Sequence, residues 1–335
     1  MNNTRKRAPT IRDVAQAAGV STATVSKFVN GGQRFSAEVE ARIGQAVSQL
    51  GWSLNPMARG MNTGLTGNVG IVLQDIRNPH FTSMVKGAAR EAAKGQMNLI
   101  VADAAESKEP ELAVLKALSR RVDGLIVSAR LPAPVIQALL DGRTPVVFYG
   151  GPSPDAAHPS VCCDSYQAGR ILGRHLRDRG CRRISYIAFP TARWSDERWQ
   201  GLQEAFEGVP GTHFTQYDAA APVSDEGERL ASAVMLSGEM PDAIVAFNDL
   251  LALGLLAEAR ALGVRVPEQV AIAGFDNIAY GRFCSPALTS VDMMSEAVGE
   301  LSMRRLVETI QGVGSTEVDV LTSRLVVRES TGLRR

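Results

Sequence analysis

The sequence predicts an α/β protein in which a small, all-α helix-turn-helix head precedes a body of two doubly wound parallel-sheet lobes. Residues 10–30 carry the capping residues and apolar spacing of two short helices joined by a tight turn. From Asn68 onward, runs rich in Val and Ile alternate with helical patterns, which is typical of parallel strands covered on both faces by helices. A length of 335 residues is more than one ordinary core organises, so several domains are expected.

The first helix of the head is expected to begin after Thr10, which can serve as its N-cap. Its apolar positions have helical spacing and are Ile11, Val14, Ala15 and Ala18. Gly19 should end the helix, because glycine tolerates the left-handed backbone of a helix C-terminus. Ser21 then caps the second helix.

The second helix divides into two faces. Val25, Phe28 and Val29 can pack inward. The outward positions are small, polar or cationic and comprise Thr22, Ala23, Ser26 and Lys27. Such a surface fits the major groove of DNA.

A third helix over 36–50 should close the head, with Val39, Ile43, Val47 and Leu50 as its apolar stripe and Gly51 as its end. Asn55 and Pro56 then begin a further helix of less than two turns. Its Gly60 costs about 1 kcal/mol relative to Ala, so the helix is marginal alone. Residues 63–68 are polar and rich in glycine, as linkers are.

The body alternates strands and helices. The predicted strands are 68–73, 97–102, 122–127, 145–150, 160–164, 183–188, 213–217, 242–247 and 269–275. The predicted helices are 81–94, 110–119, 134–140, 166–179, 197–206, 225–236 and 250–262. In doubly wound lobes, ligands bind at the carboxyl ends of the strands, so a crevice shared by both lobes is expected.

Charge is divided unevenly along the chain. The net charge is +1, yet residues up to Thr66 include eight basic and three acidic side chains. A basic head on a mildly acidic body favours a polyanionic partner for the head. The alternative is a solvated basic tail, but here the charge coincides with the helix-turn-helix pattern.

Composition excludes several other classes. No apolar run approaches the roughly 20 residues of a membrane span, and the basic N-terminus lacks the apolar core of a secretory signal. Cys162, Cys163, Cys181 and Cys284 lack metal-site spacing, so buried free thiols in a reducing cytoplasm are expected. No catalytic constellation, metal site or cofactor motif is found. The string at 149–151 is turn material.

The sequence resembles the LacI/GalR (lactose and galactose repressor) family along its whole length from Thr10. The motifs that carry the resemblance are TIRDVAQAAGVSTATVSKFVN, LGWSLNPMARGM, DIRNPHF, ERWQGLQEAF, AFNDLLALG, GFDNI, LTSVDM and LVVRES. It implies a DNA-binding transcriptional regulator, most often a repressor, that acts as a homodimer on a pseudo-palindromic operator. It also implies a body similar to periplasmic sugar-binding proteins, with a sugar, sugar acid or related effector between the lobes.

The resemblance implies specific boundaries. The head is 1–53, the hinge helix and linker 54–67, and the body 68–335. The first lobe comprises about 68–163 and 288–321, including a helix over 295–311; the second comprises 164–287 and 322–335, including a final strand over 325–328. The three chain crossings are expected near Asp164, near 286–291 and near 321–324. The polar C-terminus has no leucine heptads, which favours a dimer over a tetramer.

In the family pattern, Thr22, Ala23 and Lys27 contact bases. Thr and Ala can contact a thymine methyl, and Lys can reach guanine. Many relatives carry Arg at the position of Lys27, and Lys lacks its bidentate fork; a phosphate contact by Lys27 is an equal alternative. Phosphate contacts or caps are expected from Ser21, Thr24, Ser26 and Asn30, and a further DNA contact from Arg59. Met61 stands where the family usually has a leucine that wedges into the minor groove, with a plain linker role as its alternative.

In the body, the resemblance places effector contacts at Arg198, Asn248 and Asp276, because hydroxyl-rich or anionic ligands need such hydrogen-bonding groups. Arg198 is expected to open a helix. Asn248 and Asp276 have helix N-caps as their alternative role. Further candidates, each with packing as an alternative, are Trp194, which can stack on a sugar, and Phe81, which can act as a lid. Asp75 and Asp164 are weaker candidates for the crevice.

Two other classes of function remain open at this stage. One is a solute-binding receptor protein without DNA regulation, and the other is an enzyme that acts on a sugar. The basic head argues against the first, and the absence of a catalytic constellation argues against the second.

The weak hinge helix predicts a mutational effect. Gly60→Ala should stiffen the hinge, raise operator affinity and blunt the response to effector. Operator titrations with and without effector measure both quantities. Lower affinity in a correctly folded variant would contradict the expected coupling between hinge and operator.

Overall fold

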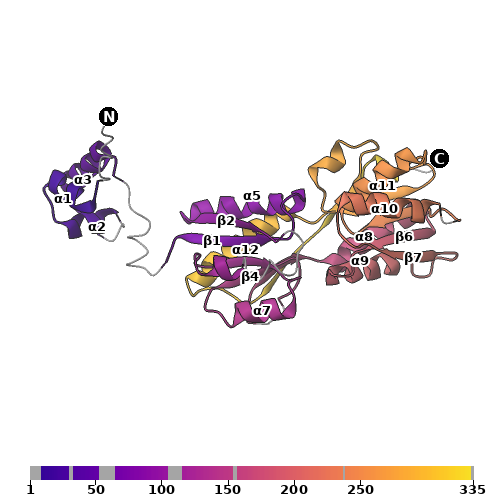
Figure 1. Ribbon diagram of the computed structural model, residues 1–335, viewed down its shortest axis with the longest axis horizontal. Coiled ribbons are helices and arrows are strands. Elements are labelled where there is room, and N and C mark those ends of the chain that lie inside the picture. Colours follow the sequence, from indigo (N-terminus) through magenta and orange to yellow (C-terminus); the bar gives the residue numbers. More distant parts are fainter. Residues whose placement is uncertain are drawn as a thin grey trace, which may run out of the picture. The chain divides into compact units, whose positions relative to one another are not determined.

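The computed structural model describes residues 9–29, 33–52, 65–104, 115–153, 157–236 and 238–332 (Figure 1). The chain forms two compact units, Met1–Thr66 and Gly67–Arg335. The first is a helical head and the second a two-lobed body, and each is described by itself.

The head consists of α1 (Ile11–Ala18), α2 (Thr22–Val29) and α3 (Ala37–Leu50). One fully buried aliphatic side chain from each helix forms the centre of its core, namely Val14, Val25 and Ile43. Gly19 and Gly51 end α1 and α3 with φ of 66° and 58°, the left-handed backbone that glycine tolerates best. The predicted helices and helix ends of the head are therefore confirmed.

Two details of the head differ from expectation. Leu50 is 37% exposed, because it lies at the open end of α3, and Ala46 faces the core instead. The predicted helix after Asn55, with Arg59, Gly60 and Met61, lies outside the described residues, as does Asn30.

The first lobe of the body is built on a six-stranded sheet in the order β11-β5-β4-β3-β1-β2. Its strands are β1 (Asn68–Leu73), β2 (Asn98–Asp103), β3 (Leu125–Ser128), β4 (Val146–Tyr149), β5 (Ser160–Cys163) and β11 (Val318–Leu321). All of its pairings are parallel. The four central strands are almost wholly buried, which explains their unbroken apolar sequence.

The second lobe has a six-stranded sheet in the order β12-β10-β9-β8-β6-β7. Its strands are β6 (Arg183–Ala188), β7 (His213–Asp218), β8 (Ala243–Ala246), β9 (Ala271–Phe275), β10 (Thr289–Asp292) and β12 (Arg324–Val326). Only the edge strand β12 runs antiparallel to its neighbour. The two doubly wound lobes predicted from the sequence are thus present.

Helices cover both faces of each sheet. In the first lobe, α5 (Pro79–Lys94) and α12 (Ser295–Ile310) pack on one face and α7 (Ala133–Leu140) on the other. In the second lobe, α8 (Ser165–Asp178) and α9 (Arg193–Glu204) cover one face, and α10 (Ser224–Met235) and α11 (Asp249–Ala261) cover the other. One apolar core continues through both lobes where the chain crosses between them.

The chain crosses between the lobes three times. It crosses at Asp164, at Met293–Met294 and between Leu321 and Arg324. The first and third crossings lie where the sequence placed them. The second follows β10 instead of lying at 286–291, so the first lobe does not begin again at 288. The reason is that β10 pairs with β9 and β12 in the second sheet.

Some elements differ in extent from the sequence prediction. Helix α9 begins at Arg193, four residues before the predicted start, so Arg198 lies inside the helix and does not open it. Strands β10 and β11 were not predicted. The predicted helix 110–119 lies partly outside the described residues; residues 115–119 are helical.

Reciprocal glycines bring helices into close contact. A Cβ at Gly87 of α5 would overlap the carbonyl oxygen of Glu296 on α12, and a Cβ at Gly299 would overlap that of Met84. The pairs α8–α9 and α10–α11 repeat this arrangement with Gly169 and Gly201 and with Gly227 and Gly254. Within the described ranges, no helix is long and apolar enough to cross a membrane.

This packing predicts that Gly87→Ala destabilises the body by about 1–3 kcal/mol, because the added methyl group has no space against α12. Gly95→Ala, at the C-cap of the same helix, is the matched control, since nothing lies closer than 3.6 Å to its added Cβ. Urea unfolding of both variants measures the difference. Equal stabilities would contradict the close packing of α5 on α12.

Candidate functional sites

The exposed face of α2 is the first candidate site. Thr22, Ala23 and Lys27 are exposed, while Val25 on the opposite face is fully buried. The Oγ of Ser21 accepts a hydrogen bond from the backbone N–H of Thr24 at 3.1 Å, so Ser21 is the predicted N-cap. Three base-contacting candidates are thereby presented on one rigid helix.

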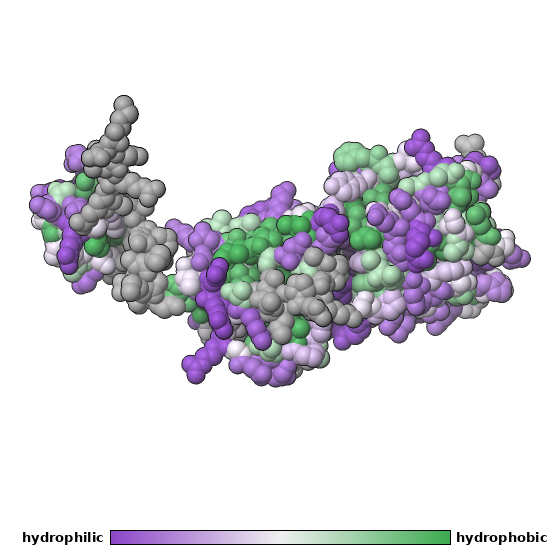
Figure 2. All heavy atoms as spheres, viewed as in Figure 1, coloured by the Kyte–Doolittle hydropathy of each residue, from purple (hydrophilic) through white to green (hydrophobic). Residues whose placement is uncertain are grey.

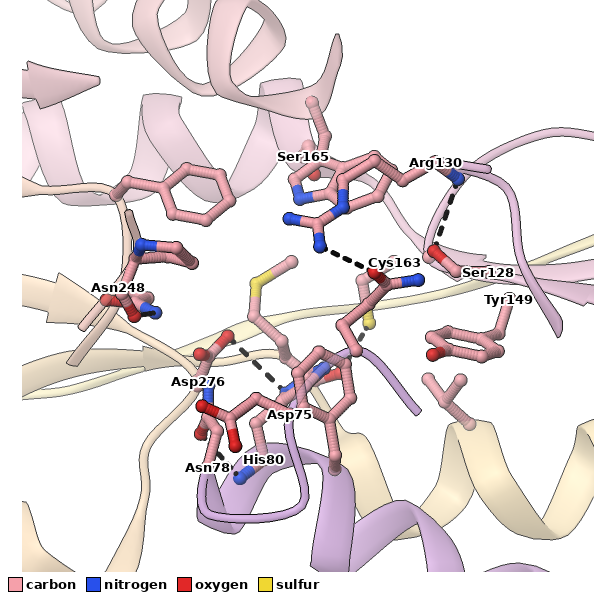
Figure 3. Close-up of a pocket in the computed structure, with 18 of the residues that line it drawn as sticks. Asp75, Asn78, His80, Ser128, Arg130, Tyr149, Cys163, Ser165, Asn248 and Asp276 are labelled. Carbon is pink, nitrogen blue, oxygen red and sulfur yellow. Dashed lines mark hydrogen bonds and ion pairs between the residues drawn. The ribbon is translucent and has the colours of Figure 1, made fainter. Parts of the chain in front are cut away.

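The second site is a cleft between the lobes, with a volume of about 820 Å³ that includes its open mouth (Figure 3). Strand ends of both sheets and the start of α5 contribute to it, as expected for doubly wound lobes. Six of the seven crevice candidates from the sequence line this cleft, namely Asp75, Phe81, Trp194, Arg198, Asn248 and Asp276. Asp164 is not among its lining residues and instead caps α8 through Gln167.

Arg198 is held rigidly in the wall of the cleft. Its guanidinium carbon lies 4.8 Å from the ring centroid of Phe247 and 4.5 Å from that of Phe275. One nitrogen, Nη1, donates to the carbonyl oxygen of Phe247. The side chain is 4% exposed, yet its Nε has no hydrogen-bond partner among the described residues. A buried cation with an unused donor is poised for a ligand.

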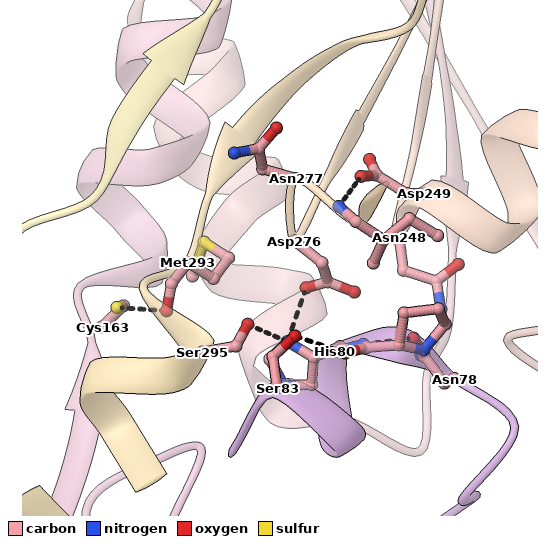
Figure 4. A network of polar contacts seen from close by, with 12 residues as sticks. Asn78, His80, Ser83, Cys163, Asn248, Asp249, Asp276, Asn277, Met293 and Ser295 are labelled. Atoms are coloured by element: carbon pink, nitrogen blue, oxygen red, sulfur yellow. Dashed lines mark hydrogen bonds and ion pairs between the residues drawn. The ribbon is translucent and has the colours of Figure 1, made fainter. Parts of the chain in front are cut away.

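Asp276 and His80 face one another across the lobes (Figure 4). Asp276 follows β9 of the second lobe, and its Oδ1 lies 3.5 Å from Nδ1 of His80 at the start of α5. The same nitrogen lies 2.8 Å from the Oγ of Ser295. Burial lowers the pKa of His80, Asp276 opposes that shift, and Arg198 adds to it. Burial therefore favours the neutral form of the imidazole.

A second carboxyl group lies behind Asp276. Burial and the charge of Asp276 raise the pKa of Asp249 well above its ordinary value. The two Asp249 oxygens accept hydrogen bonds from the Oγ of Ser290 at 2.7 Å and from the N–H of Ile278 at 2.9 Å. Asp249 thus holds the backbone that follows Asp276, directly at Ile278 and through Ser290, whose Oγ accepts from the N–H of Asn277. The φ of Asp276 is 104°, which is rare for a residue with a side chain.

Asn248 is a helix N-cap, which was the alternative to an effector contact. Its Oδ1 accepts a hydrogen bond from the N–H of Leu251 at the start of α11. Its Nδ2 donates to the carbonyl oxygen of Pro222, so both ends of the amide are already used within the protein. Asp276, in contrast, caps no helix. It lies in the loop that follows β9.

The carboxylate of Asp75 forms an ion pair with Arg77. Burial raises its pKa, but hydrogen bonds from the Arg77 side chain and backbone outweigh this and lower the pKa overall. The Arg77 Nη2 to Asp75 Oδ2 distance is 2.9 Å. The charge of Asp75 is therefore largely neutralised before any ligand arrives.

Aromatic side chains form the apolar wall of the cleft. The ring of Trp194 lies against Gly150 and Gly151, where an added Cβ would be only about 3.5 Å from the indole. Phe81 packs edge-on against Tyr149, with ring centroids 6.3 Å apart. The turn at 149–151 therefore also shapes the cleft.

Several residues that line the cleft were not among the predicted effector contacts, including Gln74, His80, Ser128, Arg130 and Tyr149 of the first lobe and Ser165 of the second. The available signal was their place directly after predicted strands or at the start of a predicted helix. Their identities alone gave no indication, because these residue types are common in ordinary loops. The four cysteines are free, as expected, and burial raises the pKa of Cys163 to about 12.

Head and cleft together define a class of protein, one that binds DNA through a helix-turn-helix and a small molecule between two lobes. Comparison with known proteins agrees with this class. Residues 10–55 match the bacterial regulatory proteins of the lacI family, and residues 174–331 match a periplasmic binding protein-like domain.

Full-length relatives show the same combination. The HTH-type transcriptional repressor CytR of Escherichia coli K12 is 28% identical over 333 residues, which is 98% of this chain and 97% of CytR. The transcriptional regulator CelR, solved with cellobiose, is 28% identical with a TM-score of 0.71 over 96% of this chain and 99% of CelR. The lac repressor dimer, solved on its operator with the anti-inducer ONPF, shares the fold at 22% identity and a TM-score of 0.84, over 97% and 99% of the two chains.

This chain combines the helix-turn-helix domain of the lacI family with a periplasmic binding protein-like body. It is a sequence-specific DNA-binding transcriptional regulator with a helix-turn-helix head and an effector-binding body.

The neutral His80 predicts a pH effect on stability. The pKa of His80 is lower in the folded state than in the unfolded state. Its contribution to the free energy of unfolding is therefore complete above about pH 6.5 and decreases as the pH falls below that value. Replacing His80 by Gln should therefore cost more stability at pH 7 than at pH 5. Urea unfolding at both values measures this change. His213→Gln, at an exposed position on β7, is the control. A cost that grew on acidification would show that His80 is held charged instead.

Proposed function

We propose that this protein is a homodimeric, cytoplasmic repressor that binds a pseudo-palindromic operator and is controlled by a sugar-type effector in the cleft. The observation that carries the proposal is the pairing of an exposed α2 face with a cleft lined by both lobes. No catalytic activity is part of this function. The relatives whose names describe a function are regulators.

On DNA, Thr22, Ala23 and Lys27 contact bases, because they are the exposed positions of α2 that face away from the head core. Ser21, Thr24, Ser26 and Asn30 contact phosphates or cap the helix, and Arg59 adds a further contact. Met61 wedges into the minor groove at the centre of the operator. The family resemblance supports these last roles.

In the cleft, Arg198 and Asp276 bind effector hydroxyl or acidic groups, and Trp194 stacks on its apolar face. Phe81 and Asp75 shape the first-lobe side. Asn248 acts mainly through the α11 terminus that it caps, because its own polar atoms are engaged. The cellobiose complex of CelR supports a sugar as the class of ligand.

Two copies pair through the body. Apolar side chains gather over α5 and β2 on the face seen in Figure 2. β2 is an edge strand whose Val101 is 37% exposed, and the second lobe exposes Phe283 at 80%. Exposed edges and apolar patches of this kind are normally covered by a partner. A second copy fits because a palindromic duplex needs two heads.

Effector control requires two states of the body. In one state the paired first lobes hold the two hinge segments close enough to fold as helices in the minor groove. In the other, closure of the cleft shifts these lobes and the hinge helices melt. Because the segment is marginally helical, a difference in effector affinity of about 1–3 kcal/mol between the states is sufficient.

A test of DNA recognition uses an operator selected by the protein from random duplexes. Lys27→Ala should weaken binding and, if Lys27 contacts a base, relax discrimination at one position of each half-site by about 1–3 kcal/mol. A phosphate contact would instead weaken all sequences equally. Lys116→Ala, at an exposed position within the helical residues 115–119, is the control. Fluorescence anisotropy at several salt concentrations separates the two roles of Lys27. Selection of no duplex would favour the solute-receptor alternative.

A further inference from the structure

Arg130 reaches from the first lobe to the second. It follows β3, where its N–H donates to the Oγ of Ser128 at 3.2 Å and its Nη2 donates to Oε1 of Gln74 at 2.7 Å. Its guanidinium carbon lies 5.2 Å from the ring centroid of Phe189, which belongs to the second lobe. Arg130 therefore lines the cleft while it bridges the two lobes (Figure 3).

Arg198 belongs to the same arrangement from the other side. Phe189 and Phe247 are neighbours, with ring centroids 5.5 Å apart, and Arg198 lies over Phe247 as Arg130 lies over Phe189. Two guanidinium groups from opposite lobes thus rest on one pair of phenyl rings at one cavity. Both side chains line the same cleft, one from each lobe.

The carboxylates that line the cleft do not bind Arg198. Asp75 accepts hydrogen bonds from the side chain and N–H of Arg77, and Asp276 faces His80 across the lobes. No carboxylate oxygen in the described ranges lies within 4.0 Å of the Arg198 guanidinium. Its buried, unpartnered Nε remains available to an acceptor supplied by a ligand.

We propose that the effector carries an anionic group, a carboxylate or a phosphate, which Arg130 and Arg198 bind from opposite lobes. The inference rests on the proposed effector function of the cleft and narrows it to sugar acids and sugar phosphates. The hydroxyl groups of such a ligand can donate to Asp276, which lines the same cleft. Because the two arginines belong to different lobes, the anion favours the closed state, and its binding is coupled to lobe movement.

The experiment compares neutral sugars with their charged counterparts on the full-length protein. The probes are glucose, gluconate, glucuronate and glucose 6-phosphate, and ribose, ribonate and ribose 5-phosphate, with inorganic phosphate alone as a further arm. Thermal shift ranks the probes, and calorimetry measures their dissociation constants. At least one charged probe should bind tenfold or more tightly than its neutral counterpart. Tighter binding of the sugar acids would identify a carboxylate as the anionic group, and tighter binding of the sugar phosphates would identify a phosphate.

Two substitutions test the role of Arg130. Arg130→Gln removes the charge and should reduce the preference for the charged probe over its neutral counterpart at least tenfold. Arg130→Lys keeps the charge and should retain part of it. Lys86→Gln, which removes an exposed cation from α5 of the same lobe, should leave the preference unchanged. The melting temperature without ligand verifies that each variant folds.

The outcomes separate this inference from the proposed function. A neutral sugar that binds as tightly as its acid and phosphate, and that releases operator, would overturn the anionic effector and leave the regulatory function standing. An unchanged preference in Arg130→Gln would equally overturn the role of Arg130. If no sugar, acid or phosphate binds, the effector class itself is wrong.

Discussion

The body depends on the contacts that hold its three chain crossings together. The Sγ of Cys163 at the first crossing donates to the carbonyl oxygen of Met293 at the second, 2.9 Å away. Asp292, just before the second crossing, pairs with Arg324 at the third at 3.0 Å. These contacts keep the carboxyl ends of both sheets facing one another, and every ligand-facing side chain in the cleft depends on that placement.

The cleft contains a buried cation with an unused hydrogen-bond donor and a carboxylate on a strained backbone. The Arg198 guanidinium lies between two phenyl rings with an unused donor, and Asp276 adopts a strained backbone that the buried Asp249 carboxyl group supports. Such features are costly for stability and are typical of sites that wait for a ligand. Cross-lobe contacts of His80 and Arg130 connect the same site to the relative position of the lobes.

The head is a small three-helix unit that exposes one face of α2. Three short helices enclose a core centred on Val14, Val25 and Ile43, and this core leaves one face of α2 exposed. Helix caps such as Ser21 and Gly19 fix where α2 begins and where α1 ends. A DNA-reading surface is therefore obtained without an apolar partner for the outer face of α2.

The sequence by itself determined the helix-turn-helix and the alternation of strands and helices, because these follow from local spacing and capping. The resemblance to a known family supplied six of the residues that line the cleft. Tertiary structure decided the rest. The place of β10 depends on pairing with β9 and β12, which no local pattern encodes. Likewise, Arg130 and His80 gain their importance only from Phe189 and Asp276 on the opposite lobe, and contacts between residues so far apart in sequence arise only when both lobes have folded.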